Sequence, residues 1–339
     1  MNEAEALELS AAQREAGWAA SNRGDYGAAR EAFTAAVGLL QSIPSPMSTV
    51  AKRALANALR ARGTIHDDQH NFAAASRDAS ACATLLAEPD LAAAPGIQRL
   101  QVMCRTLQGN LCSHGGTPEY NPEAALEHYM ASLAIVEADQ RSEIELAPSE
   151  HGLVRAKKLP MGIALVNVAC AEDDLGRVEE AKAHLTQAIQ HSNTEGNPRC
   201  AGNAHSAFGK ILSHEGRWLE AAQHYRDALR LFREAGQVHL EAQELAILHR
   251  VQQTAAELQD QPDVAVELAD ALRRVGRVPD GTCGICYDEL ELGPGVFVLE
   301  ICLHAYHREC VERFWETKGH GPARQWTALC PMCHGQRVM

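Results

Sequence analysis

The chain has 339 residues, 46% of them hydrophobic, with 31 Lys and Arg residues against 44 Asp and Glu residues. This length provides enough apolar material for about two or three domains. The formal net charge of −13 argues against a nucleic-acid partner, because affinity for phosphates comes mainly from clustered Lys and Arg. No apolar run approaches the roughly 20 residues that a membrane-spanning helix needs, so we expect no membrane insertion.

The N-terminal residues predict a protein that is not exported. Residues 1–5 lack both the basic start and the apolar stretch of a signal peptide. N-myristoylation requires a glycine directly after the initiator methionine, where this chain has Asn2. Cysteines outside the C-terminal region follow no pattern, as expected for small buried residues in a reducing compartment; they are Cys82, Cys104, Cys112, Cys170 and Cys200. We therefore expect a cytoplasmic protein, or a nuclear one.

Residues 1–237 repeat a helical pattern in which a turn residue precedes an aromatic or apolar residue and a series of small residues. The first copy starts with Gly24-Asp25-Tyr26 and continues through Phe33, and later copies start at His70, Gly176 and Gly216. A fifth copy, around Tyr129, lacks the glycine turn. Another small residue stands seven residues before the turn in four copies, namely Gly17, Gly63, Ala169 and Gly209. In the copy around Tyr129 the corresponding small residue is Gly109, and the turn is longer.

Apolar residues at helical spacing alone would indicate a generic helical bundle. The repeated combination of turn, small residue and aromatic instead resembles the tetratricopeptide repeat, whose paired antiparallel helices approach closely at small residues. The resemblance implies an all-α fold, a tetratricopeptide-type α-solenoid of about five copies over residues 1–237. Copies lie about 40 to 56 residues apart, more than the usual ~34, so we expect extended helices or loops. Breaks between copies are expected at Pro44, Pro89, Pro148 and Pro198, because proline ends helices.

Residues 238–276 carry apolar positions at helical spacing and are expected to form two capping helices, because a terminal repeat must cover its exposed face. Tetratricopeptide arrays bind peptides or protein surfaces in a groove lined by the first helix of each pair. The resemblance therefore implies a substrate protein or peptide as a partner. For most of the expected groove residues a solvated helix face is the alternative; they are Arg14, Trp18, Asn57, Arg60, Asn110, His114, Asn203, Lys210 and His214.

After a predicted linker over residues 277–282, the chain holds eight metal-ligand side chains. Their order is Cys283-x2-Cys286-x15-Cys302-x1-His304-x2-His307-x2-Cys310-x19-Cys330-x2-Cys333. Zinc favours four tetrahedral thiolate or imidazole ligands, and a tight turn can aim two ligands at one ion when two residues separate them. Eight ligands therefore predict two zinc ions. His320 and His334 are further imidazoles that this count does not need.

Other interpretations leave ligands without a role. Cys283 and Cys286 could form a redox dithiol, and the segment from Cys330 to His334 fits the C-x-x-C-H haem attachment signature. Either interpretation leaves six of the eight ligands unexplained. A PHD finger usually has cysteine at the position of His304 and an aromatic at that of Ala328.

The ligand order resembles the RING finger with two central histidines, the RING-H2 type, over residues 283–339. In this family the ligand pairs interleave, so that both ends of the segment are tied together in a cross-brace. A unit so small cannot bury enough apolar surface to fold alone, and metal binding supplies the missing free energy. The resemblance implies Cys283, Cys286, His307 and Cys310 on one zinc, and Cys302, His304, Cys330 and Cys333 on the other.

A RING finger implies ubiquitin ligase activity, with a ubiquitin-conjugating enzyme and ubiquitin as partners. Such a domain positions the loaded conjugating enzyme for attack by a substrate lysine and forms no covalent intermediate itself. The chain contains no P-loop, dinucleotide-binding, zinc-protease or nucleophile-elbow motif. The resemblance implies contacts with the conjugating enzyme from Ile285, Pro331 and either Phe314 or Trp315.

One position departs from the family pattern. His334 stands directly after the eighth ligand, near the place where active RING fingers often carry an arginine that bridges to ubiquitin, and Arg337 follows three residues later. The alternative function is therefore a non-enzymatic scaffold whose zinc domain mediates protein–protein interaction. Repeats followed by a paired-histidine RING resemble the rapsyn family in layout alone, because those proteins are myristoylated on a glycine at the position of Asn2.

Overall fold

The computed structural model of the chain contains two compact units, Met1–Ala181 and Lys182–Met339, which we describe separately. The structure describes residues 2–22, 25–114, 120–141, 146–149, 152–155, 158–258, 264–276, 282–290, 295–299, 302–317 and 330–331. No helix within these ranges is both long enough and apolar enough to cross a membrane.

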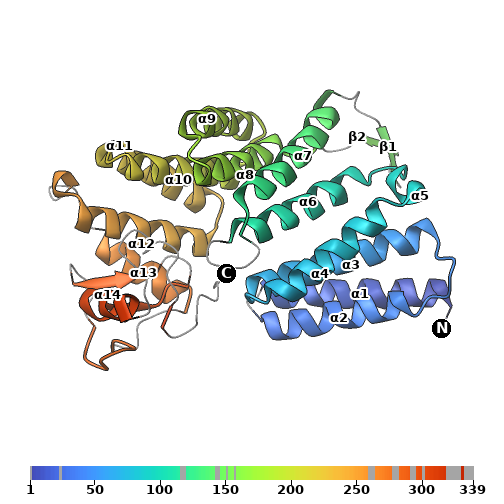
Figure 1. Ribbon diagram of the computed structural model, residues 1–339, viewed down its shortest axis with the longest axis horizontal. Coiled ribbons are helices and arrows are strands. Elements are labelled where there is room, and N and C mark those ends of the chain that lie inside the picture. Colours follow the sequence, from blue (N-terminus) through green and yellow to red (C-terminus); the bar gives the residue numbers. More distant parts are fainter. Residues whose placement is uncertain are drawn as a thin grey trace. The chain divides into compact units, whose positions relative to one another are not determined.

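Helices pack against their sequence neighbours in the first unit, as Figure 1 shows. α1 pairs with α2, α3 with α4, and α6 with α7, which also contacts α8. A two-stranded antiparallel sheet, β1 and β2, separates α7 from α8 in the sequence. The bounds are α1 Glu3–Asn22, α2 Tyr26–Gln41, α3 Thr49–Asp68, α4 Phe72–Leu86, α5 Pro89–Ala92, α6 Gln98–Ser113, α7 Pro122–Arg141, β1 Leu146–Ser149, β2 Gly152–Arg155 and α8 Met161–Asp174.

The second unit continues the helical pattern and ends in a small mixed region. α10 pairs with α11, which contacts α12, and α12 contacts α13. A second antiparallel sheet, β3 and β4, is followed by α14. The bounds are α9 Val178–Thr194, which begins in the first unit, α10 Pro198–His214, α11 Trp218–Glu234, α12 Val238–Thr254, the short 3₁₀ helix η1 Ala256–Leu258, α13 Ala265–Arg274, β3 Val296–Val298, β4 Ala305–His307 and α14 Arg308–Thr317.

The repeated turns have a common backbone geometry. Gly216 has φ 75°, its N–H donates to the carbonyl of Ser213, and the N–H of Arg217 donates to that of Leu212, so the last carbonyls of α10 are satisfied. In the second copy His70 adopts φ 56° at the same position, a conformation that L-residues seldom take. Asn71 then accepts a hydrogen bond from the N–H of Ala74 and caps α4.

The expected all-α solenoid is confirmed, with two differences around the prolines. Pro89 and Pro198 lie in the first turn of α5 and α10, so they begin helices as well as ending the preceding ones. Pro148 lies in β1, where its partner across the sheet is Leu153. A local strand pair therefore stands where a helix break alone was expected.

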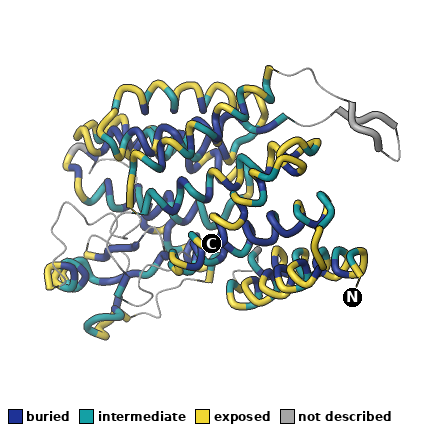
Figure 2. Tube along the Cα trace, turned by 45° about the vertical axis from the view of Figure 1, so that its right-hand side comes forward, coloured by how far each residue is buried: buried dark blue, intermediate teal, exposed yellow. Residues whose placement is uncertain are grey.

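Small residues and aromatic rings face each other within the helix pairs. A Cβ atom added to Gly17 would lie 2.8 Å from the ring of Phe33, and one added to Gly209 would lie 2.7 Å from that of Tyr225. Both rings are buried. The Tyr225 hydroxyl also lies 3.1 Å from the hydroxyl of Ser213, which donates to the carbonyl of Gly209. Figure 2 shows buried and exposed stretches that alternate along the helices, as expected for helices with one face in a core.

The C-terminal mixed region shares one core with the preceding helices. A single cluster of buried apolar residues includes Leu248 of α12, Leu268 of α13, Val296 of β3 and Trp315 of α14. The side-chain amide nitrogen of Gln253 donates to the backbone carbonyl of Val296 at 3.5 Å, and the Arg308 guanidinium donates to the side-chain amide oxygen of Gln253. The Arg308 guanidinium also lies over the ring of Phe297, 5.6 Å from its centroid.

We predict opposite effects for alanine at two glycines of the α1–α2 pair. Gly38 of α2 has open space around its Cβ position, so Gly38→Ala should stabilise the protein by about 0.5–1 kcal/mol through helix propensity. Gly17→Ala forces the buried Phe33 ring to move and should destabilise it by about 1–3 kcal/mol. Thermal unfolding followed by circular dichroism gives the sign, and equal shifts for both variants would contradict the close approach.

Candidate metal centre and helical groove

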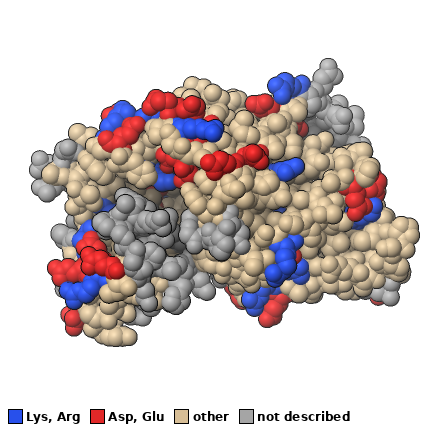
Figure 3. Space-filling view, in the orientation of Figure 1, with Lys and Arg blue, Asp and Glu red and all other residues tan. Residues whose placement is uncertain are grey.

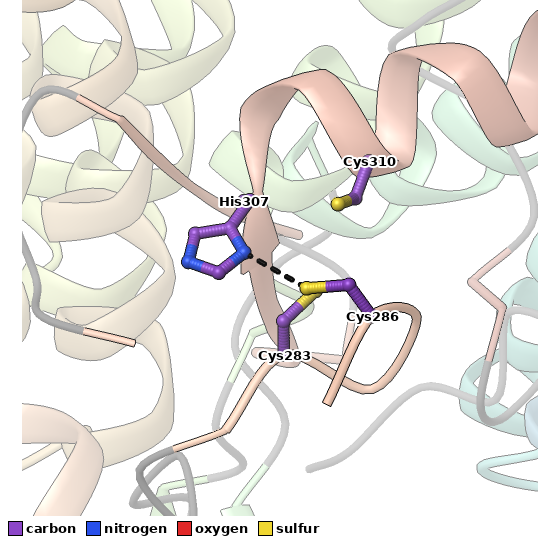
Figure 4. Close-up of side chains that lie close together, drawn as sticks. All are labelled: Cys283, Cys286, His307 and Cys310. Carbon is purple, nitrogen blue, oxygen red and sulfur yellow. Dashed lines mark hydrogen bonds between the residues drawn. The ribbon is translucent and has the colours of Figure 1, made fainter. Parts of the chain in front are cut away.

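Four ligand side chains converge from three elements in the C-terminal region (Figure 4). Cys283 and Cys286 lie on one turn, His307 ends β4, and Cys310 lies in the first turn of α14. One ligand atom from each lies within 4.8 Å of all the others, and His307 Nδ1 is 3.2 Å from Cys286 Sγ. Three sulfurs and one imidazole nitrogen form a donor set that suits tetrahedral Zn²⁺.

Hydrogen bonds around this cluster prepare its side chains for a cation. His307 Nε2 lies 2.9 Å from the carbonyl oxygen of Glu289, so Nε2 carries the proton and Nδ1 keeps its lone pair toward the sulfurs. Burial by itself would raise the pKa of the Cys283 thiol. Backbone N–H groups near its sulfur outweigh burial and lower this pKa to about 7; they belong to Cys286, His307 and Ile285.

A second cluster contains Cys302, His304 and Cys330, whose ligand atoms also lie within 4.8 Å of one another. His304 Nδ1 is 3.3 Å from Cys330 Sγ. The fourth expected ligand, Cys333, lies outside the described residues. The structure therefore groups the seven described ligands as the cross-brace implies. Cys302 and His304 lie with Cys330, whereas the ligand pair before them in the sequence lies with the pair after them, His307 and Cys310.

The side chain of Tyr306 supports the second cluster from within the core. Tyr306 is fully buried, and its hydroxyl oxygen is 2.9 Å from Cys330 Sγ. A metal-bound thiolate carries no proton, so the hydroxyl would be the donor in this contact. Sequence analysis missed this role, and the signal would have been a hydroxyl-bearing aromatic between two ligands, His304 and His307.

Tight turns follow one cysteine of each cluster. Tyr287, directly after Cys286, has φ 66°, and its N–H donates to the carbonyl of Cys283 at 2.8 Å. Leu303, directly after Cys302, has φ 59°. Both backbones adopt the left-handed region that non-glycine residues seldom enter. The turns aim neighbouring ligands at one point, which is the geometry that a shared ion requires.

The structure separates the two aromatic candidates for partner contact. Trp315 is only 2% exposed and packs edge-on against Phe297 with ring centroids 5.3 Å apart. Its expected role as a surface contact is therefore corrected, since this side chain belongs to the core. Phe314, Ile285 and Pro331 are half-buried, and the first two pack against the edge of the same core. His334 and Arg337 lie outside the described residues.

Several expected groove residues lie together on the first helices of two pairs. Arg14 of α1 and Asn57 of α3 line the same cavity of about 430 Å³. The Arg60 guanidinium lies 5.3 Å from the ring centroid of Trp18 and donates to the Asn57 amide oxygen at 3.3 Å. Arg60 is only 6% exposed and is not among the residues that line this cavity, so it acts on the groove through its contact with Asn57.

Other expected groove residues contact neighbours inside their own unit. The Asn110 amide oxygen accepts a hydrogen bond of 2.8 Å from the Tyr129 hydroxyl. His114 Nε2 lies 2.7 Å from a carboxylate oxygen of Asp67. Lys210 and His214 are exposed and Asn203 is half-buried on α10, in the second unit.

Sequence analysis missed the other eight residues that line the cavity with Arg14 and Asn57, and three of them have long side chains that end in a cation or a thioether. These three are Arg53 of α3 and Arg99 and Met103 of α6. Arg53 could have been found because it lies four residues before Asn57 and hence on the same helix face. On the face that Figure 3 shows, by contrast, basic and acidic side chains are interspersed.

The C-terminal region matches a known family model. The model of the Ring finger domain matches residues 281–334, which contain all eight expected ligands. Comparison with curated proteins finds no match.

Solved structures resemble the helical part at low sequence identity. BtubC (BKLC) from P. vanneervenii is 15% identical with a TM-score of 0.51, covering 72% of this chain and 88% of that one. The Rap conjugation gene regulator of plasmid pLS20, in complex with the Phr* peptide, is 14% identical with a TM-score of 0.54, covering 78% and 65%. A Rap protein complexed with Competence and Sporulation Factor is 11% identical with a TM-score of 0.52, covering 79% and 77%. The chain therefore combines a helical-repeat fold with a C-terminal segment, residues 281–334, that matches the Ring finger domain.

Proposed function

We propose that the protein is a RING-type E3 ubiquitin ligase that recruits its substrate through the helical repeats. The observation that carries the proposal is the cross-braced grouping of ligand side chains within the segment that matches the Ring finger model. The domain binds a ubiquitin-loaded conjugating enzyme and holds the thioester in a reactive position, so it needs no nucleophile of its own. The proposal includes the cytoplasm, or alternatively the nucleus, as the compartment in which the protein acts.

Two zinc ions are part of the proposal. Cys283, Cys286, His307 and Cys310 would hold one, and Cys302, His304, Cys330 and Cys333 the other. Each ion supplies folding free energy by joining segments that are distant in the sequence. Ile285 lies between two of these ligands and Phe314 follows Cys310 on α14, and both side chains pack against the edge of the domain's core. Their positions would therefore depend on the bound ions.

Ile285, Phe314 and Pro331 form the proposed contact set for the conjugating enzyme. All three are half-buried, so each keeps apolar surface that a partner can cover. The repeats would supply the second binding function. Two of the similar structures are complexes with the Phr* peptide and with Competence and Sporulation Factor, which supports binding of a peptide or protein segment as the proposed role of this solenoid.

The second candidate function is a non-enzymatic scaffold, which the identity of residue 334 favours. Histidine lacks the planar fork of donors with which arginine can bond two partners at once. The two candidates differ in one measurable property, since a scaffold would not accelerate ubiquitin discharge from a loaded conjugating enzyme.

Replacement of Ile285 tests the proposed ligase surface. Ile285→Ala should reduce the rate of ubiquitin discharge to free lysine by about tenfold or more, because a central apolar contact contributes most to partner binding. Discharge is measured with a panel of ubiquitin-loaded conjugating enzymes, and zinc content and circular dichroism confirm folding. Ile163→Ala, which replaces a 43% exposed isoleucine on α8, is the matched control. Equal rates for both variants would count against this surface.

Removal of the Tyr306 hydroxyl tests the second zinc centre. Tyr306→Phe should keep the core packing but weaken zinc affinity by about 10–100-fold, as loss of an outer-shell hydrogen bond typically does. A chromophoric chelator measures the amount and rate of zinc release, with two zinc ions per chain expected in the wild type. Tyr287→Phe, at a side chain that is 78% exposed, should release zinc like the wild type. One zinc per chain in the wild type would refute the assignment.

An arginine after the eighth ligand separates ligase from scaffold. His334→Arg should raise the discharge rate severalfold, because guanidinium provides a fixed set of donors toward both ubiquitin and the conjugating enzyme. The same discharge assay measures the effect. If neither the wild type nor His334→Arg accelerates ubiquitin discharge from any conjugating enzyme of the panel, the scaffold function is favoured.

A further inference from the structure

A cavity of about 430 Å³ lies on the first helices of three successive parts of unit Met1–Ala181. Its volume falls within the range of about 300–1,000 Å³ that is usual for ligand pockets. Three arginines lie in its wall, one from each of α1, α3 and α6, and no Asp or Glu among the described residues lines it. The lining consists of Leu7, Arg14, Val50, Arg53, Ala54, Asn57, Gly96, Arg99, Leu100 and Met103. We call this cavity the arginine groove.

No ion pair joins an arginine of the arginine groove to a carboxylate among the described residues of its unit, although the exposed Glu15 interacts electrostatically with Arg14. Arg53 donates two hydrogen bonds of 3.1 Å to the backbone carbonyls of Pro95 and Gly96, which hold the side chain without cancelling its charge. Arg14 has a buried Nε with no acceptor among the described residues. Lys52, the residue before Arg53, binds both Glu88 and Asp90, so these two carboxylates are already paired. The groove therefore presents positive charge in a chain whose net charge is −13.

Another arginine-lined cavity of the protein shows the opposite arrangement. Its wall in unit Lys182–Met339 contains Arg233, Arg273 and Arg274 together with Glu267 and Asp270. Arg233 binds Glu267 at 2.6 Å, and Arg273 binds Asp270. Arg274 is paired as well, 2.8 Å from Glu241. The arginines of this second cavity are therefore paired with carboxylates, and the arginine groove differs from it in this respect.

The arginine groove also offers apolar surface and a side-chain amide. Val50 is 64% exposed and Met103 is 38% exposed, whereas Leu100 is buried beneath them at 7%. Asn57 lines the groove and its amide oxygen accepts from Arg60, which leaves the two N–H donors of the amide nitrogen for a ligand. A ligand that fits must combine negative charges with apolar groups and carry hydrogen-bond acceptors along its length.

We propose that the arginine groove binds an acidic linear segment of a partner protein. Carboxylates of the segment pair with Arg14, Arg53 and Arg99, whose planar guanidinium groups suit bidentate carboxylate contacts. Apolar side chains of the segment cover Val50 and Met103, and a backbone carbonyl accepts from Asn57. The inference deepens the proposed function, in which the repeats recruit a substrate, by stating the chemistry of the segment recognised.

Peptide probes test the charge and the apolar part separately. Three fluorescent peptides of about ten residues alternate leucine with glutamate, with glutamine or with lysine, and their binding to the full chain is followed by anisotropy. The glutamate peptide should bind about tenfold or more tightly than the glutamine peptide, and the lysine peptide should not bind. Added salt should weaken the glutamate peptide because exposed charges are screened.

Arginine replacements locate the binding site. Arg14→Gln combined with Arg99→Gln should weaken the glutamate peptide about tenfold or more, and Arg99→Gln alone should have a smaller effect in the same direction. Arg99 is exposed, so its single replacement leaves the fold intact. Arg77→Gln, at an exposed arginine of α4 outside the groove, is the matched control and should bind like the wild type. Thermal unfolding of every variant confirms that the helices remain folded.

Several outcomes would overturn the proposal. Equal binding of the glutamate and glutamine peptides would indicate a purely apolar groove, and a double variant that binds like Arg77→Gln would place the binding site elsewhere. Sedimentation showing a dimer that the double variant dissolves would mean that a second copy covers the groove. Ubiquitin discharge to free lysine does not use the groove, so discharge without peptide binding overturns this inference alone, and peptide binding without discharge overturns the ligase alone.

Discussion

Close approach between paired helices is the constraint on which the solenoid depends. A helix can approach its partner closely only where one side of the contact lacks a side chain and the other supplies a large one. Gly17 facing Phe33 and Gly209 facing Tyr225 meet this condition in different units of the chain. Because the arrangement recurs with the sequence pattern, successive first helices present equivalent faces. The arginine groove follows from this regularity, since its arginines lie on α1, α3 and α6.

Metal binding and solenoid packing are joined in the second unit. One apolar core extends from Leu212 of α10 through α12 and α13 to Trp315 and Cys330. The Arg308 side chain adds a polar contact through Gln253 of α12. A RING finger usually relies on its ions because its own core is small. Here the helices contribute apolar surface as well, so loss of the metal would also expose part of the helical core.

The proposed functions divide the chain between two chemistries. The repeats of the first unit present three arginines that form no ion pair with the described residues, beside exposed apolar groups, which suits recognition of a flexible acidic segment. The RING finger presents half-buried apolar side chains such as Ile285 and Phe314 at the edge of a metal-organised core. In these proposals the first arrangement would select a partner by charge and the second by apolar shape, so variants at either surface can be designed without changing the other.

The order of ligands and the repeated turn, small-residue and aromatic positions determined both domain families from the sequence, because these features depend on local spacing. Only the tertiary structure decided which side chains reach the surface. Trp315 and Phe314 are adjacent in the sequence, yet packing against Phe297 buries the first and leaves the second half exposed. The hydroxyl contact from Tyr306 to Cys330 and the gathering of Arg14, Arg53 and Arg99 join segments far apart in the chain. Local spacing cannot specify such contacts, since they depend on how whole elements pack.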